Sequence, residues 1–101
     1  VRHGLARLDA CMPHLLLLPQ GGTAAGTGLN RHPEFDRAFV AAVAERTGLR
    51  FVPNPDKSEG MAAHDAFVEL HGALNTLACS LMKIANDVRL LGSGPRAGFG
   101  E

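Results

Sequence analysis

The segment from Met61 to Leu91 constrains the fold more than any other part of the chain. It contains no proline and a single glycine, Gly72. Its large apolar residues recur at alternating steps of three and four, the heptad spacing of a helix that packs along one seam. The seam residues are Phe67, Leu70, Leu74, Leu77, Leu81, Ile84, Val88 and Leu91. We therefore predict one long helix over 61–91 with a buried apolar seam.

Such a helix is too long for a chain of this size to cover. Thirty-one helical residues span roughly 46 Å, whereas a compact chain of this length has a radius of gyration of about 13 Å. Small apolar residues also flank the seam, which is typical of a helix inside a bundle. We predict an all-α fold, a long-helix bundle completed by helices outside this chain. Asn75, Asn86 and Arg89 are expected to hydrogen-bond between helices, and support of an anion site is the alternative.

Proline and glycine residues delimit the elements that precede the long helix. Apolar residues at helical spacing predict a first helix that Pro13 should kink or interrupt. Pro33 is a typical first residue of a second helix, and Gly48 is a typical residue at its end. The connection that follows Gly48 could include a very short strand. The expected elements are helices at about 2–18, 33–47 and 61–91, and a glycine-rich loop at 20–30.

Composition argues against several classes of partner. Ten Lys and Arg balance ten Asp and Glu, so the formal net charge is zero. We therefore expect no nucleic-acid partner and no anionic membrane surface, and no apolar run is long enough for a membrane span. Cys11 and Cys79 lie far apart without a Cys-x-x-Cys pair, which fits a reducing compartment such as the cytoplasm.

The motifs for phosphate and metal binding are incomplete. Gly21 and Gly26 have the spacing of a phosphate-binding loop, but Thr27 stands where that loop requires lysine. The glycines are better explained by a tightly turning backbone. His64 and His71 lie seven residues apart, which is too far for one ion on a single helix. We expect no metal site, and histidines that are packed or hydrogen-bonded.

Four stretches resemble class II fumarases over nearly the whole chain. They are GGTAAGTGLN at 21–30, AAHDA at 62–66, ELHGALNTLACSLMKIAND at 69–87, and LGSGPR at 91–96 with Gly98, Gly100 and Glu101 after it. Aspartate ammonia-lyase shares the glycine loop and the Ser-Gly-Pro-Arg turn, but it is less similar in the AAHDA and ACSLMKIAND stretches. The chain departs from the fumarase pattern at 56–60, DKSEG, where Asn-Lys-Phe-Glu-Ala is usual. Ser58 should lose an apolar contact there, and Gly60 should weaken a helix start.

The resemblance implies a reaction and an assembly. The implied reaction is the reversible hydration of fumarate to L-malate without metal or organic cofactor, acting on a small dicarboxylate. The implied assembly is a homotetramer joined through long central helices, in the cytoplasm or, in a eukaryote, the mitochondrial matrix. The chain is expected to be an internal piece of such an enzyme, because it begins with Val1 inside a predicted helix.

The catalytic motifs of the family should lie before Val1 and after Glu101, so the resemblance places no catalytic residue in this chain. The chain alone is then expected to be inactive and to supply scaffold and subunit interface. Thr27 and Asn30, on the glycine loop, are candidates for lying near the substrate. Two alternatives stay open: an aspartate ammonia-lyase of the same fold, and a non-enzymatic helical oligomerisation module.

Overall fold

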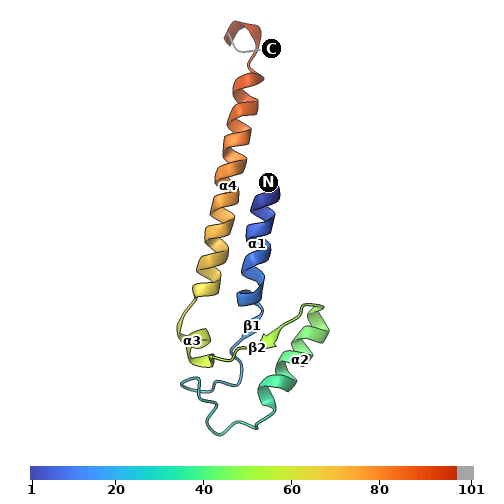
Figure 1. Cartoon of the computed structure of the whole chain (residues 1–101), viewed down its shortest axis with the longest axis vertical. Helices are drawn as coiled ribbons and strands as arrows, with labels where there is room; N and C mark the ends of the chain where they lie inside the picture. Colours follow the sequence, from blue (N-terminus) through green and yellow to red (C-terminus); the bar gives the residue numbers. More distant parts are fainter. Residues whose placement is uncertain (98–101) are drawn as a thin grey trace.

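The computed structural model describes residues 1–97 of the chain. Two helices lie side by side as a stalk, and the smaller elements gather at its foot (Figure 1). In order, the elements are α1 (Arg2–Leu15), β1 (Leu17–Leu18), α2 (Phe35–Thr47), β2 (Val52–Pro53), α3 (Lys57–Ala62), α4 (Asp65–Leu91) and a 3-10 turn, η1 (Pro95–Ala97). The predicted all-α architecture is confirmed. Gly98, Gly100 and Glu101, which carry part of the resemblance, lie outside the described residues.

The molecule is far from compact. Its radius of gyration is 21.5 Å and its extents are 73 × 26 × 16 Å, whereas a compact chain of this length would have a radius of gyration of about 13 Å. Cys11 and Val40 are the buried apolar side chains among the described residues, at 4% and 2% exposed. A core this small cannot account for a stable fold, because burial of apolar surface is the main stabilising contribution.

Helix α1 packs antiparallel on the first part of α4 (Figure 1). Gly4 makes the close approach possible, since a Cβ atom there would lie 2.6 Å from Leu77 Cδ1. The N-terminus of α1 reaches only about midway along α4. In the lower half of the predicted seam, Leu70 and Leu77 are half-buried, whereas Phe67 and Leu74 are 66% and 46% exposed. Helix α1 therefore covers only part of the lower half, and the upper half has no cover from within the described residues.

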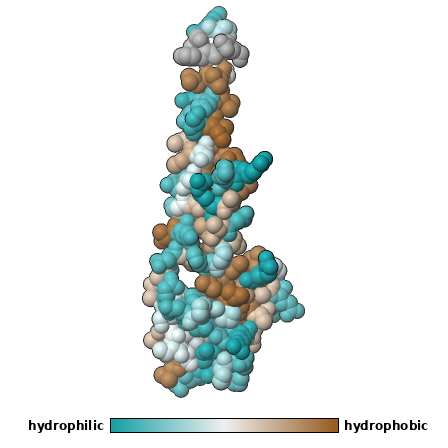
Figure 2. Space-filling model, viewed as in Figure 1, coloured by the Kyte–Doolittle hydropathy of each residue, from teal (hydrophilic) through white to brown (hydrophobic). Residues whose placement is uncertain are grey.

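The uncovered half of the seam forms an apolar surface on the upper stalk (Figure 2). Leu81 and Ile84 are 46% and 47% exposed, and Val88 and Leu91 are 66% and 64% exposed. No residue of α4 is buried in this chain, so the burial predicted for the seam is not met by residues 1–97. An apolar helix face of this length is stable in water only when another surface covers it.

The first helix ends three residues earlier than expected. Leu17–Leu18 leave the helix and form a parallel two-stranded pair with Val52–Pro53. Two backbone hydrogen bonds, of 2.9 and 2.8 Å, join the segments. Pro13 stays inside α1 and does not end it. The short strand considered for the connection after α2 is present as β2. Because Leu17–Leu18 pair with β2, the chain leaves the helical conformation after Leu15.

The long helix also begins later than predicted. The segment 57–91 divides into α3 and α4, because Ala63 adopts an extended conformation with ψ of 159°. Helix α3 begins early because the Asp56 side chain accepts a hydrogen bond from the Glu59 N–H at 3.0 Å. No proline or glycine marks the break. It arises because α3 packs under β1 whereas α4 packs on α1.

The substitution Gly26→Ala should destabilise the glycine loop. Gly26 has a φ of +85°, and an added Cβ would overlap the backbone of Ser58 in α3. The left-handed conformation alone costs an alanine about 1–2 kcal/mol, and the overlap adds to this. Thermal unfolding followed by circular dichroism should show a lower midpoint. Gly72→Ala is the control, because nothing lies within 4 Å of its added Cβ; an equal loss in both variants would contradict the close approach.

Candidate functional site

The glycine-rich loop folds back on itself through a series of left-handed residues. Gly21, Gly26 and Gly28 have φ values of +92°, +85° and +72°. A hydrogen bond of 3.1 Å from the Gly28 N–H to the Gly22 carbonyl closes the loop. Only glycine adopts such φ values without strain, which agrees with the interpretation of these residues as turn formers.

Thr27 and Asn30, the residues predicted to lie near substrate, are both exposed on this loop. Asn30 is itself left-handed, with a φ of +63°, a conformation that asparagine tolerates better than most residues. Arg31 follows Asn30 directly, and its side chain lies close to Gly28. Their proximity to substrate stays a prediction.

An ion cluster centred on Asp36 joins the loop to α2 and α3. The Lys57 Nζ lies 2.9 Å from Asp36 Oδ2, and the Arg31 Nη1 lies 3.0 Å from Oδ1. The Lys57 Nζ also donates to the Asn54 carbonyl oxygen at 2.9 Å, and the Arg37 N–H donates to Asp36 Oδ1. The cluster therefore ties residues 31–37 to residues 54–57, two regions that are distant in sequence.

The hydrogen bond from Lys57 lowers the pKa of Asp36 to about 2, with help from the Arg37 N–H and the two cationic neighbours against the opposing effect of desolvation. Because the pKa is depressed in the folded chain, this stabilisation is complete above the ordinary pKa of an aspartate. It is lost as the pH falls through about 2. The cluster is thus intact at any physiological pH.

Sequence reasoning missed this cluster. Asp36 lies in the first turn of α2, where an acidic residue is common, and nothing local links it to Lys57, 21 residues later. The partners meet only because β1 pairs with β2 and brings the start of α3 against the glycine loop.

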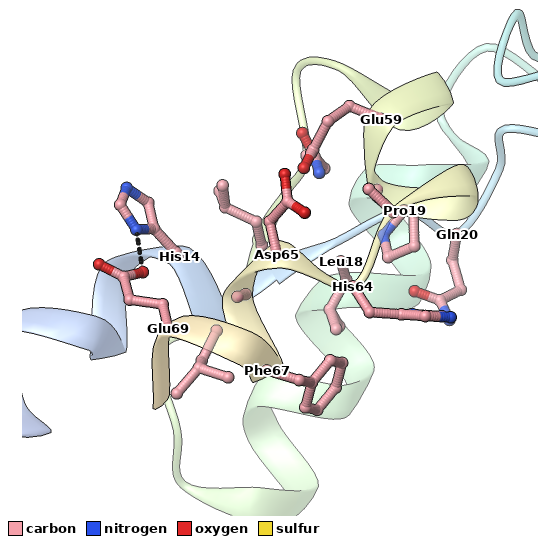
Figure 3. Close-up of a pocket in the computed structure, with 15 residues that line it drawn as sticks. His14, Leu18, Pro19, Gln20, Glu59, His64, Asp65, Phe67 and Glu69 are labelled. Carbon is pink, nitrogen blue, oxygen red and sulfur yellow. Dashed lines mark hydrogen bonds and ion pairs between the residues drawn. The ribbon is translucent and has the colours of Figure 1, made fainter. Parts of the chain in front are cut away.

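A cavity of about 670 Å³ opens at the foot of the stalk, between the end of α1, β1, α3 and the start of α4 (Figure 3). Its floor is apolar, and its rim carries acidic and histidine side chains. The floor includes Leu15, Leu17, Leu18, Pro19 and Phe67, and the rim includes His14, Glu59, His64, Asp65 and Glu69. Pockets of this volume and composition hold ligands or side chains of other segments.

His14 and Glu69 close one side of the cavity and join α1 to α4. The His14 Nδ1 lies 2.7 Å from Glu69 Oε2, as the dashed line in Figure 3 marks. This hydrogen bond raises the pKa of His14. Both side chains are exposed, 62% and 45%, so the pair contributes little to stability.

The residues that depart from the fumarase pattern have structural roles at this site. The Ser58 hydroxyl donates to the Ala25 carbonyl in the glycine loop at 2.7 Å. Ser58 was expected to lose an apolar contact, and the structure shows that it makes a polar contact with the glycine loop. Gly60 leaves room for the Asn54 side chain, since an added Cβ would lie 2.5 Å from its Nδ2.

The site holds no arrangement typical of metal chemistry. Over residues 1–97, His, Cys, Asp and Glu side chains do not gather in groups of three or more that could hold an ion. The same part of the chain contains no helix both long and apolar enough to cross a membrane.

Comparison with known proteins identifies the family. The chain matches the family described as Lyase over residues 1–101, and it belongs to that family. It is 60% identical to the mitochondrial fumarate hydratase of Rhizopus oryzae over 98% of this chain and 20% of that protein. It is 59% identical to the class II fumarate hydratase of Nitrosomonas europaea over 98% of this chain and 21% of that protein.

A solved structure supports the same assignment. A class II fumarase from Schistosoma mansoni matches with a TM-score of 0.80 and 33% identity, over 93% of this chain and 23% of that one. The resemblance to class II fumarases is thus confirmed. The chain spans about a fifth of the length of the curated relatives it matches.

Replacement of Lys57 by methionine should destabilise the foot of the stalk. The change keeps the aliphatic stem but removes two hydrogen bonds, one of them to a carboxylate. Hydrogen bonds to charged groups contribute about 1.5–3 kcal/mol, so a loss of that size in the free energy of unfolding is expected from chemical denaturation.

Lys83→Met is the matched control. Lys83 pairs with Asp87 one helical turn away, with its side chain 73% exposed, and such pairs contribute about 0.3–0.5 kcal/mol. Equal losses in the two variants would mean that the Asp36 cluster does not hold the foot together.

Proposed function

We propose that the chain is the central helical part of a class II fumarate hydratase, whose complete form interconverts fumarate and L-malate. The observation that carries the proposal is the identity of about 60% to proteins named fumarate hydratase over nearly all of the chain. The fold similarity to a class II fumarase supports it independently. The catalytic groups are then supplied by segments outside residues 1–101.

In this proposal the chain contributes scaffold. Helices α1 and α4 form part of the helical bundle, and the uncovered seam from Leu81 to Leu91 packs against helices of other subunits in a homotetramer. The exposure of that seam supports the assembly, because four large apolar side chains on one helix face need a partner surface.

Further parts of the proposal concern the substrate and the compartment. The glycine loop, held in shape by its left-handed residues, positions Thr27 and Asn30 toward the dicarboxylate cleft of the complete enzyme. The compartment is the cytoplasm in a bacterium or the mitochondrial matrix in a eukaryote. The Rhizopus oryzae relative carries the word mitochondrial in its name.

The reaction is tested on the full-length parent protein. Purified parent is given fumarate with and without ammonium, the loss of fumarate absorbance is followed, and the product is identified. We expect malate without ammonium, and no conversion by residues 1–101 alone. Aspartate formed only with ammonium would indicate a sister lyase. No loss of fumarate under either condition would contradict both enzymes and favour an oligomerisation module.

The assembly is tested by Leu81→Asp in the same parent. A carboxylate placed in a buried apolar seam has no partner, and its burial costs several kcal/mol, so the tetramer should dissociate in sedimentation velocity. Ser80→Asp, one residue away, exposed and outside the apolar seam, should leave the tetramer intact. A Leu81→Asp protein that still sediments as a tetramer would refute the packing of this seam.

A further inference from the structure

Helix α4 carries a second seam on the side that faces away from α1. Leu77 faces α1, and Val68 and Asn86 each lie about two and a half turns of helix from it, so they point in the opposite direction. The residues on that side recur at alternating steps of three and four, as those of the apolar seam do. They are Asp65, Val68, Gly72, Asn75, Cys79, Met82, Asn86 and Arg89, and all of them are exposed. We call this set the outer seam.

Gly72 leaves an open space in the middle of the outer seam. Glycine inside a helix is unfavourable relative to alanine, yet among the described residues nothing beyond its own helix backbone lies within 4 Å of a Cβ atom added there. No contact within the chain therefore explains the missing side chain. Gly4, by contrast, is the point where Leu77 of α4 approaches the backbone of α1. A glycine on a helix face thus accompanies a close helix contact in this fold.

The outer seam is complementary to an antiparallel copy of itself. Antiparallel helices that share a heptad seam place each residue of one copy opposite a fixed residue of the other. In the register centred on Leu77, Asp65 lies opposite Arg89 of the second copy, Val68 opposite Asn86, Gly72 opposite Met82, and Asn75 opposite Cys79. Because Leu77 is close to the midpoint of Asp65–Leu91, nearly the whole helix takes part.

This register matches size and charge at once. The single glycine of the outer seam faces its single methionine, Met82, which is 63% exposed and whose unbranched side chain fits irregular spaces. The single acid faces the single base, so Asp65 of one copy pairs with Arg89 of the other. A shift of one heptad in either direction loses both matches, because Gly72 would then face Asn75 or Arg89.

Charges beside the outer seam agree with the same register. Glu69 and Lys83 each follow a seam residue, and antiparallel pairing brings Glu69 of one copy beside Lys83 of the other. In the structure Glu69 is bonded to His14 and Lys83 to Asp87. A carboxylate accepts several hydrogen bonds and an ammonium group donates several, so both side chains retain capacity for a contact between copies.

We propose that α4 pairs antiparallel with α4 of a second copy of this chain through the outer seam, with Met82 of each copy seated over Gly72 of the other. The two-fold axis passes beside the helix at the level of Leu77. The apolar seam from Leu81 to Leu91 lies on another side of α4 and stays available to other helices. The inference deepens the proposed function and rests on it, because it names the helix face and the register through which two subunits of the complete enzyme meet.

The test is disulfide cross-linking in the full-length parent, with Cys79 as one half of each pair. Asn75→Cys places a second thiol opposite Cys79 of the other copy. Oxidation should then give several-fold more disulfide-linked dimer than in the wild-type parent, with a bond between residues 75 and 79 identified by mass spectrometry. The bond does not form within one helix, because Cβ atoms four residues apart are about 5–6 Å from each other, whereas a disulfide spans about 3.5–4.5 Å.

Two matched variants separate this register from its neighbours. A pair shifted by one heptad would bring Val68→Cys opposite Cys79 in one direction and Met82→Cys opposite Cys79 in the other. Both variants should give no more dimer than the wild type, and a cross-link in either of them without one in Asn75→Cys would refute the register. A wild-type parent linked through Cys79 to Cys79 would have parallel helices, which overturns the proposal. No cross-link in any variant would mean that another segment of the parent covers the outer seam, which also overturns it.

An exchange of side-chain size tests the same contact without cross-linking. Gly72→Leu fills the space assigned to Met82 of the other copy, so the dissociated fraction in sedimentation velocity should rise several-fold. Addition of Met82→Ala should restore the assembly, because it returns the space. The two residues lie about 15 Å apart along one helix and cannot compensate for each other within one copy. A double variant with native helix content by circular dichroism that dissociates as much as Gly72→Leu would refute the contact.

Fumarate hydration is assayed in the same preparations, which separates the two proposals. A parent that hydrates fumarate without the cross-link between residues 75 and 79 refutes the antiparallel pairing only. A parent that gives this cross-link without hydrating fumarate refutes the proposed function only.

Discussion

The contact between α1 and α4 is the interaction on which the rest of the molecule depends. It is made possible by Gly4, whose missing side chain lets Leu77 approach the α1 backbone. Because α1 is 14 residues long and α4 is 27, the contact ends halfway along the stalk. Beyond that point α4 continues with its apolar face exposed to solvent. At the opposite end of the stalk, the small elements connect the end of α1 to the start of α4.

The foot of the stalk is organised by charge more than by apolar burial. Asp36 is 9% exposed, and its two cationic partners are Arg31, which directly follows the glycine loop, and Lys57 in α3. Burial strengthens such contacts because solvent screening is reduced. The β1–β2 pair and the left-handed glycines bring the partners within reach, and the cluster in turn holds the loop against α3. The same packing forms the cavity beneath the stalk.

The family pattern and its local departures have different physical explanations. The glycine loop keeps its glycines because three of them adopt positive φ values that other residues resist. Ser58 and Gly60 depart from the pattern where the loop and β2 meet α3, and each is matched by a neighbour. Ser58 donates to the Ala25 carbonyl, and Gly60 accommodates the Asn54 amide. Exchanges of this kind keep the fold because the contact is replaced by another of similar size.

The helical class, the long apolar seam, the turning loop and the family could all be predicted from the amino-acid sequence, since each depends on spacing or composition within one segment. Tertiary structure alone decided where α1 ends, because Leu17–Leu18 pair with a strand 35 residues later. It also decided the break at Ala63, the Asp36–Lys57 contact and the cavity. These features arise when distant segments meet, and no periodicity within a single segment encodes which residues will face one another.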